Sequence, residues 1–486
     1  MKEKQFNSRI GGNKIYTPRN LTLLLLLITA LGIGISQLGV FIGFTAIVAP
    51  ILIFYVANVF KKPKVIFYSA LIMAFIALGL TKYYTAPLGL SIDFLLITGW
   101  LCVFFSSKKI IWSNLNNGYC YAVVLWFAWV CFEIVNPEAK SILAWFFAMR
   151  GIGLYCLLTI PLCFLFFNNT KHQESFIKIW FTFGILGSLW GCRQLYFGLN
   201  DAENAWLAAG NNLTHILHGK LRVFSFFSDA GQFGASQAHT FLVSTILALG
   251  PYSIKKKIFY SITAASTFWG MMISGTRGAI IVPVIGFLIY AIMTKKIKIL
   301  VLGFFISLSA FAFLKYTRIL HSNYQIARMR TALNPDNASF NVRIENQKKL
   351  SRYLRNRPIG GGIGSAGYWG LRFSPNTFLA RTPTDSWYVQ IWAENGIVGL
   401  FLYVCMLIYF LIKGFITIWK LQDPNYKQIA VAFYAGFLGI VFASYGNKVL
   451  GQMPTGMLIY ISIAFVHLST KFEKQTNQLK NGPMDT

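Results

Sequence analysis

Long apolar stretches, separated by short polar segments, recur from one end of the chain to the other. About 20 apolar residues suffice to cross the hydrocarbon core of a bilayer as a helix. The pattern predicts an all-α polytopic membrane protein with about fourteen spans, and twelve full spans is an acceptable variant. The weakest assignment is the connection at 137–149, which is also compatible with a re-entrant or interfacial piece. The predicted spans lie near residues 20–36, 38–60, 65–81, 87–106, 119–136, 150–167, 175–197, 231–252, 258–275, 278–293, 299–315, 396–418, 427–446 and 453–470.

The N-terminal region has two interpretations. Residues 1–19 are basic, and an apolar stretch from Leu21 to Ile35 follows them, which is an arrangement typical of a signal peptide. The region has no convincing small-x-small cleavage site, and a second apolar stretch begins near Leu38. We therefore expect an uncleaved first span, and a single polytopic membrane domain over residues 1–486.

Lysines mark every second short loop between the predicted spans. Loops on the cytoplasmic side of membrane proteins are enriched in Lys and Arg. If the N-terminus is cytoplasmic, this alternation holds along the whole chain and returns the C-terminal tail to the cytoplasm. Both termini are therefore predicted to be cytoplasmic. The lysines in these loops and in the tail are Lys61, Lys62, Lys64, Lys108, Lys109, Lys171, Lys255, Lys256, Lys257, Lys295, Lys296, Lys298, Lys420, Lys427, Lys471 and Lys474.

Composition agrees with a membrane protein. Of the 486 residues 55% are hydrophobic and only 12% are charged, where a soluble protein of this length usually has about twice that charged fraction. The seven cysteines lie in or beside apolar stretches, with an odd count and no CxxC pair. They therefore predict neither a disulfide framework nor a metal site.

Two of the predicted outer loops are long, at 198–230 and 316–395. The second lies between the fourth-last and third-last spans, and loops of this length are usually functional. It carries eleven Lys and Arg residues against four acidic residues, and Arg predominates. One interpretation is a basic helix near 343–357 that lies on anionic headgroups. The other is a site for a phosphate-bearing substrate, since the planar guanidinium group suits phosphate oxygens.

Arginines stand beside predicted span ends on the outer side. Arg277 lies in the tight hairpin Ser274–Ala279, where a charged side chain in apolar surroundings is energetically unfavourable unless it is paired or faces a water-filled cavity. Its small neighbours Gly275 and Gly278 favour close approach by another group over simple snorkelling to headgroups. Arg150 is predicted at the outer start of a span. The four arginines are Arg150, Arg222, Arg277 and Arg343.

The second half of the large loop contains a glycine-rich turn and an isolated aspartate. Gly362, Gly364 and Gly367 match a GxGxxG pattern, but no strand–turn–helix unit surrounds them, so a closely packed or flexible turn is favoured over a nucleotide site. Asp385 follows a Pro-Thr turn. It is interpreted either as the N-cap of a helix or as a general base near the arginines.

These segments, in this order, resemble the O-antigen polymerase and ligase family of bacterial envelope glycosyltransferases. The resemblance covers roughly residues 220–410. It rests on the Arg222 segment before a span, the hairpin Ser-Gly-Thr-Arg-Gly around Arg277, and Asn-Val-Arg at Arg343. It also rests on Pro-Ile-Gly-Gly-Gly-Ile-Gly from Pro358, and on the stretch from Asp-Ser-Trp-Tyr at Asp385 to Ala-Glu-Asn-Gly-Ile-Val-Gly-Leu.

The resemblance implies a glycosyltransferase of the bacterial inner membrane. Such enzymes transfer a glycan from polyprenyl (undecaprenyl) diphosphate to an acceptor hydroxyl on the periplasmic side, without a metal or other cofactor. It implies that Arg222, Arg277 and Arg343, and with less support Arg150, bind the diphosphate. An aspartate at position 385 is chemically sufficient as the catalytic base. Because diphosphate charge grows as the glycosidic bond breaks, fixed guanidinium groups suit this reaction.

Three functions remain open at this point. A polymerase adds the glycan to another lipid-linked repeat of a surface polysaccharide, such as O-antigen or exopolysaccharide. A ligase adds it to the lipid A core of lipopolysaccharide or to another anchor. Ligases of the family typically have His before Asn where this chain has Asp385 and Ser386, which favours the polymerase. A transporter or flippase of lipid-linked sugars is the third alternative, although no internal repeat is evident.

Overall fold

A computed structural model describes residues 62–84, 87–105, 110–217, 219–295 and 338–480, with a few short stretches between 50 and 61 and between 309 and 330. The predicted spans at 20–36, 38–60 and 299–315 lie wholly or mostly outside the described residues, as does most of 316–337. Residues from Ile66 to Thr486 form one compact unit, and Met1–Val65 another. The following description concerns the unit that begins at Ile66.

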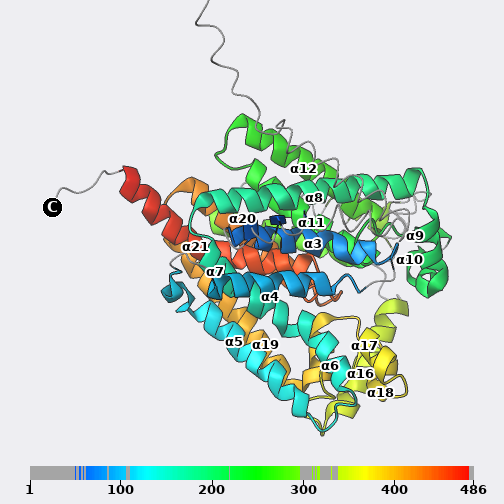
Figure 1. The fold of residues 1–486 in the computed structure, drawn as a ribbon. Helices are drawn as coiled ribbons and strands as arrows, with labels where there is room; N and C mark the ends of the chain where they lie inside the picture. The colour runs from blue at the N-terminus through cyan, green and yellow to red at the C-terminus, as the bar shows by residue number, and fades with distance from the viewer. Residues whose placement is uncertain are drawn as a thin grey trace, which may run out of the picture. The chain divides into compact units, whose positions relative to one another are not determined.

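Helices account for nearly all of the regular structure in this unit (Figure 1). The long helices are α3 (Lys64–Leu80), α4 (Leu90–Phe104), α5 (Gly118–Phe132), α7 (Tyr155–Phe166), α8 (Thr170–Tyr196), α11 (Ala230–Ala248), α12 (Ile254–Ile273), α13 (Ile281–Thr294), α16 (Ala338–Leu354), α19 (Trp387–Lys420), α20 (Pro424–Ala443) and α21 (Thr455–Lys480).

Shorter elements connect these helices. The short α-helices are α6 (Ile142–Met149), α9 (Asp201–Trp206), α10 (Asn212–His215), α17 (Gly367–Phe373) and α18 (Phe378–Arg381). The 3-10 helices are η2 (Trp112–Leu115), η3 (Glu133–Val135) and η6 (Arg277–Ile280), and the π-helical segments are η4 (Arg150–Leu154) and η5 (Leu207–Asn211). Strands β1 (Ile216–Leu217) and β2 (Lys220–Leu221) form an antiparallel hairpin.

Seven described helical segments are long and apolar enough to cross a membrane. The protein is therefore an all-α, multi-pass membrane protein, as the apolar pattern predicts. Two further apolar helices, α3 and α4, are somewhat shorter. The seven segments are Gly118–Val135, Ile142–Phe166, Thr170–Tyr196, Arg277–Thr294, Trp387–Lys420, Pro424–Ala443 and Thr455–Gln478.

Helix α11 is buried among other helices along almost its whole length. It packs against α8, α12, α13 and α20. Its polar side chains bond to those neighbours: Thr240 accepts a hydrogen bond from the indole of Trp180 at 2.8 Å, and Gln237 accepts one from Ser188 at 3.0 Å. Because these side chains face protein, α11 can be less apolar than the helices with lipid-exposed faces.

Contacts between helix ends distinguish two ends of the unit. At one end Lys256, near the start of α12, pairs with Glu174, near the start of α8, at 2.7 Å. At the same end Lys471, late in α21, donates to Asn114 before α5 at 3.3 Å. This end, which we call the lysine end, carries Lys256 and Lys471 from two of the predicted cytoplasmic segments. The opposite end, the arginine end, carries Arg222 and the other arginines discussed below.

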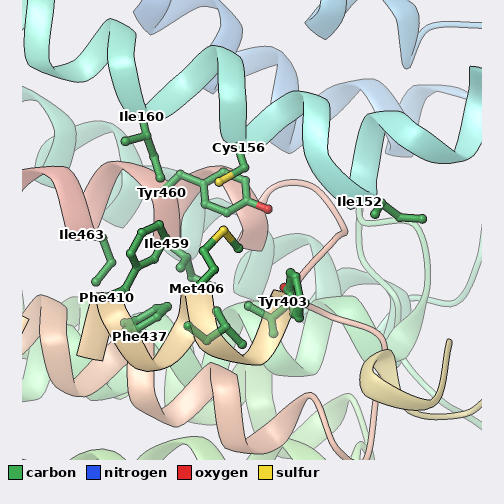
Figure 2. Close-up of a pocket in the computed structure, with 12 residues that line it drawn as sticks. Ile152, Cys156, Ile160, Tyr403, Met406, Phe410, Phe437, Ile459, Tyr460 and Ile463 are labelled. Carbon is green, nitrogen blue, oxygen red and sulfur yellow. The ribbon is translucent and has the colours of Figure 1, made fainter. Parts of the chain in front are cut away.

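The interior between α7, α19, α20 and α21 is closely packed. Figure 2 shows the largely apolar side chains that line a small cavity there, including Cys156, Met406, Phe410 and Tyr460. The cavity has a volume of about 10 Å³, which is about the minimum for one water molecule. It is too small for a substrate.

The structure corrects the prediction for 137–149. A helix begins at Ile142 and continues through η4 and α7 to Phe166, so Ile142–Met149 is the first part of a span. Arg150 therefore lies inside this helical segment and not at its start. The prediction failed because Arg150 interrupts the apolar stretch, whereas in the fold its charge is paired.

The start of the span predicted at 396–418 is also corrected. Helix α19 begins at Trp387, and the chain kinks at Gly396, which has a φ of 64°. The first turns carry Gln390, Glu394 and Asn395, which lowers their apolarity. They fold as helix because neighbouring segments surround them, and Glu394 and Asn395 are fully buried.

Candidate functional site

Arg222 follows the β1–β2 hairpin and precedes α11. Its backbone N–H donates to the carbonyl of His215 at 2.7 Å, and its guanidinium donates to the carbonyl of Thr214 at 2.9 Å. The guanidinium also donates to Oγ1 of Thr276 at 3.2 Å. These bonds place the Arg222 side chain directly beside the hairpin that contains Arg277.

The hairpin between α12 and α13 is packed through small side chains. Thr276 donates to the carbonyl of Ala230, the first residue of α11, at 2.7 Å. A methyl group at Gly278 would lie 2.6 Å from Nδ2 of Asn447, so the hairpin also touches the linker between α20 and α21. Arg277, between Thr276 and Gly278, is thereby fixed at the arginine end of the bundle.

Asp385 and Arg343 form an ion pair at the arginine end. Nε of Arg343 on α16 lies 3.4 Å from Oδ2 of Asp385, and the two side chains are 41% and 45% exposed. Asp385 precedes the N-cap residue Ser386, and no side-chain cap bond is made at the start of α19. The interpretation of Asp385 as an N-cap is therefore wrong. Its carboxylate lies beside a guanidinium and is accessible to a reacting group.

A pocket lies around this ion pair. It has a volume of about 170 Å³ and is lined by α16, the start of α19 and the α20–α21 linker, which contributes Tyr445. Asn346 in its lining is 9% exposed, and its amide nitrogen has no hydrogen-bond partner among the described residues. Polar groups at a partly enclosed pocket are what a hydroxyl-rich ligand requires. The lining residues are Arg343, Ile344, Asn346, Gln347, Pro383, Asp385, Ser386, Val389 and Tyr445.

The linker between α20 and α21 connects the two arginine-bearing regions. Asn447 touches Gly278 beside Arg277, and the next residue, Lys448, donates from Nζ to Oγ1 of Thr384 at 2.8 Å. Thr384 immediately precedes Asp385. Sequence analysis missed this linker, although Lys448 was a signal. In the predicted topology it is a lysine in a short outer loop, where the positive-inside rule does not expect one.

Comparison with known proteins adds independent information to this geometry. Residues 262–404 match a family model described as O-antigen ligase, and this range contains Arg277, Arg343 and Asp385. A curated relative, an O-antigen polymerase of Salmonella muenchen, is 26% identical over 203 residues, which are 40% of this chain. The match spans 48% of the relative, so the chain aligns with about half of its length.

These two matches support the O-antigen polymerase and ligase family. They agree with the resemblance carried by the residues and motifs quoted from the sequence. Arg222 and the α20–α21 linker lie outside the range of the family model, and the tertiary contacts place both beside matched residues.

The glycine-rich turn packs the large loop against neighbouring helices. The N–H groups of Gly361 and Gly362 donate to the carbonyls of Ala393 and Glu394 in α19, at 3.0 and 2.9 Å. Gly364 has a φ of 82°, and a methyl group there would lie 2.5 Å from the carbonyl oxygen of Ala144 in α6. The turn thus fastens the large loop to two spans, and the expectation of a closely packed turn is confirmed.

A buried lysine supports the segment that carries Arg222. Nζ of Lys82 donates to the carbonyls of Ser225 and Phe227, and lies 4.1 Å from the centre of the Phe224 ring. Burial lowers the pKa of Lys82 to about 7, an effect that the carboxylates of Asp229 and Glu203 oppose. The backbone after Arg222 is thereby held in one position before α11 begins.

Arg150 stands apart from the other four candidates. Its guanidinium pairs with Asp93 of α4 at 2.6 Å, and donates to the hydroxyl of Tyr155 at 2.9 Å. The side chains of Arg150 and Asp93 are only 12% and 10% exposed. The contacts therefore support a structural ion pair, and diphosphate binding by Arg150 stays a prediction.

Replacing Arg150 alone is expected to destabilise the protein strongly. Arg150→Met leaves Asp93 buried without its counter-ion, which typically costs about 3–5 kcal/mol. The double variant Asp93→Leu/Arg150→Met removes both charges and is expected to recover most of that loss. Thermal unfolding of the purified protein in detergent measures both effects. Equal destabilisation by the single and double variants would contradict a structural role for the pair.

Proposed function

We propose that this protein transfers an oligosaccharide from polyprenyl diphosphate to an acceptor hydroxyl, and that it polymerises repeat units of a surface polysaccharide. The observation that carries the proposal is the Arg343–Asp385 ion pair in the lining of the pocket between α16, the start of α19 and the α20–α21 linker. We further propose that the arginine end faces the periplasm and that both termini are cytoplasmic, so the inner membrane delivers the lipid-linked donor.

In the proposed reaction, the acceptor oxygen forms a bond to the anomeric carbon of the donor glycan. The bond from that carbon to the diphosphate oxygen breaks, and polyprenyl diphosphate leaves. The proton of the acceptor hydroxyl passes to the Asp385 carboxylate and later to water. A positioned carboxylate of this kind typically accelerates such a step about 10²- to 10⁴-fold.

The arginines would stabilise the leaving group. Arg222 and Arg277 lie in touching segments, and the α20–α21 linker connects these segments to Arg343 and Asp385. Negative charge accumulates on the diphosphate as the glycosidic bond breaks, and fixed donors aimed at that charge lower the barrier. The arrangement supports group transfer over transport, because a transporter needs no carboxylate beside the reacting end of its cargo.

Two observations favour the polymerase over the ligase. The chain has Asp385-Ser386 where ligases of the family typically have His-Asn. The curated relative that matches 203 residues is named an O-antigen polymerase. Ligation to a lipid A core or another anchor is the second candidate, because the family model that covers Arg277 through Asp385 is described as O-antigen ligase.

Deletion of the gene tests the proposal, with surface glycans separated on a gel. Loss of a polymerase is expected to leave single repeat units attached to the acceptor core. Loss of a ligase would leave polymer on the carrier lipid and a bare core. Loss of surface glycan together with accumulation of lipid-linked repeats on the cytoplasmic side would favour a flippase and contradict both transferase assignments.

A further inference from the structure

Helix α17 presents three side chains of different character on one exposed face. Tyr368, Leu371 and Arg372 are three and four residues apart, so they are neighbours on the helix surface. Tyr368 and Leu371 are 67% and 55% exposed, and Arg372 is exposed as well. Arg372 donates from its guanidinium to the hydroxyl of Tyr368 at 3.5 Å. An aromatic ring, an aliphatic side chain and a guanidinium group thus share a surface that we call the α17 face.

The opposite side of α17 is pressed against protein. Gly370 is buried, and a methyl group there would lie 2.3 Å from the carbonyl oxygen of Ser365 in the glycine-rich turn. The same methyl group would lie 3.3 Å from Cα of Ala380 in α18. Because the turn and α18 hold this side of the helix, the α17 face is directed away from the protein.

Ring stacking joins α17 to a membrane span. Phe147 of α6 stacks on Trp369, with 4.8 Å between the ring centres and 15° between the ring planes. The same ring lies 5.9 Å from the ring of Phe373, at 8°. Helices α6 and α17 therefore lie side by side at the arginine end (Figure 1).

The exposed side chains of α6 indicate which solvent surrounds α17. Ile142, Leu143 and Phe146 are apolar and exposed, and they belong to the membrane-spanning segment Ile142–Phe166. A contiguous exposed apolar surface on a span is a surface for lipid. The ring of Phe146 lies 5.5 Å from that of Phe147, which carries the ring stack with α17. The lipid-facing surface of the span therefore continues onto the α17 face.

We propose that α17 lies in the membrane interface at the arginine end, with phospholipid as the partner of the α17 face. Leu371 enters the boundary of the acyl chains, the Tyr368 ring lies among the headgroups, and the Arg372 guanidinium reaches lipid phosphates. Tyrosine is enriched at this depth of a bilayer, and arginine extends its charged end from apolar surroundings to the headgroups. The inference goes beyond the proposed function, because lipid contact does not depend on the reaction.

Contact with lipid at α17 would also set the depth of the Asp385 pocket. A methyl group on Gly367, the first residue of α17, would lie 3.3 Å from Nζ of Lys448. Lys448 in turn bonds to Thr384, next to Asp385. With α17 among the headgroups, the pocket lies near the same level, where the diphosphate of a membrane-bound donor would be. This consequence, unlike the lipid contact, rests on the proposed function.

Photocrosslinking from position 368 tests the lipid contact. The full-length protein carries p-benzoyl-phenylalanine in place of Tyr368, which keeps an aromatic ring there. It is reconstituted into vesicles of phosphatidylethanolamine and phosphatidylglycerol, and mass spectrometry identifies the adducts. The matched control carries the same probe in place of Asp201, an exposed residue at the same end of the bundle. We expect phospholipid adducts from position 368 in about 10-fold excess over the control, as for an interfacial helix.

Three results of this experiment would overturn the inference. Equal yields of lipid adducts from the two positions would mean that the α17 face lies in water. Adducts to another peptide of this chain, or to a second copy, would mean that protein covers the face. Preferential adducts to a soluble fragment of the surface polysaccharide, added to the vesicles, would identify a glycan-binding surface instead.

Substitutions separate this inference from the proposed function. Leu371→Glu adds a charge where insertion is deepest, and is expected to lower the lipid adducts from position 368 several-fold. Leu371→Met keeps an apolar side chain and is expected to match the wild type. Unchanged adducts in Leu371→Glu would contradict the lipid contact. Arg343→Ala should lose glycan transfer with wild-type lipid adducts, whereas normal transfer in that variant would count against the proposed function alone.

Discussion

Replacing Asp385 with asparagine is expected to lower the rate of glycan transfer by about 10²- to 10⁴-fold, the contribution typical of a positioned general base. Asparagine is nearly the same size and can still contact Arg343, but it cannot accept the proton of the acceptor hydroxyl. The carboxylate is 45% exposed and lines the pocket, so the loss arises from chemistry and not from folding. Surface glycan on gels should fall to single repeats.

The control for this variant is Asp201→Asn. Asp201 is an exposed aspartate in the first turn of α9, at the same end of the bundle and outside the Asp385 pocket. Both variants should reach the membrane at wild-type levels, and Asp201→Asn should give wild-type glycan. A normal distribution of chain lengths in Asp385→Asn would remove Asp385 from the mechanism, and would direct attention to another base in the pocket.

Replacing Arg343 with alanine is expected to reduce transfer by about 10²- to 10³-fold, as removal of one fixed donor to a developing negative charge usually does. The side chain contacts Asp385 at 3.4 Å and is 41% exposed, so its removal should not unfold the loop. Arg343→Lys should recover only part of the activity, because a point charge does not reproduce the planar fork. Single-turnover assays with lipid-linked donor measure the loss.

Arg381→Ala is the matched control for Arg343→Ala. Arg381 belongs to the same large loop and is exposed, and its guanidinium bonds to the carbonyl of Pro375 and the side chain of Asn376, outside the pocket. If general positive charge in the loop mattered, Arg381→Ala would impair transfer as much as Arg343→Ala. We expect Arg381→Ala to be close to wild type, since only Arg343 lies beside the proposed base.

The predicted helix in the large loop is present, and its contact with lipid headgroups stays a prediction. A helix forms at Ala338–Leu354, where the sequence suggested one near 343–357. Its charged face carries exposed residues, such as Glu345 and Lys349, which pair at 2.9 Å. The same helix also places Arg343 and Asn346 at the pocket. Both interpretations concern this one helix and stay predictions, because helical spacing alone does not separate them.

The sequence by itself determined the membrane environment and the all-α fold class, and it carried the resemblance to the O-antigen polymerase and ligase family. In lipid, the backbone N–H and C=O groups of an apolar stretch of span length find hydrogen-bond partners within a helix. The positions of the helices therefore follow from the local apolar pattern. The order of the short arginine, glycine and aspartate motifs then pointed to the family. Arg277 and Asp385 became candidates because charged groups near the ends of apolar spans are energetically unfavourable, and such groups are usually paired or functional.

Only the tertiary structure decided which of these residues meet. In the sequence Arg150 resembled the other arginines. In the fold, the segment that joins α6 to α7 packs beside α4, and Arg150 forms an ion pair with Asp93 there. Lys448 stands more than sixty residues after Asp385, and only the packing of α20 and α21 beside α19 joins it to Thr384. The local order of apolar and polar residues indicates how unfavourable it is to place each residue in lipid. Which charges pair depends instead on contacts between segments that are distant in the sequence. No single stretch of sequence encodes those contacts.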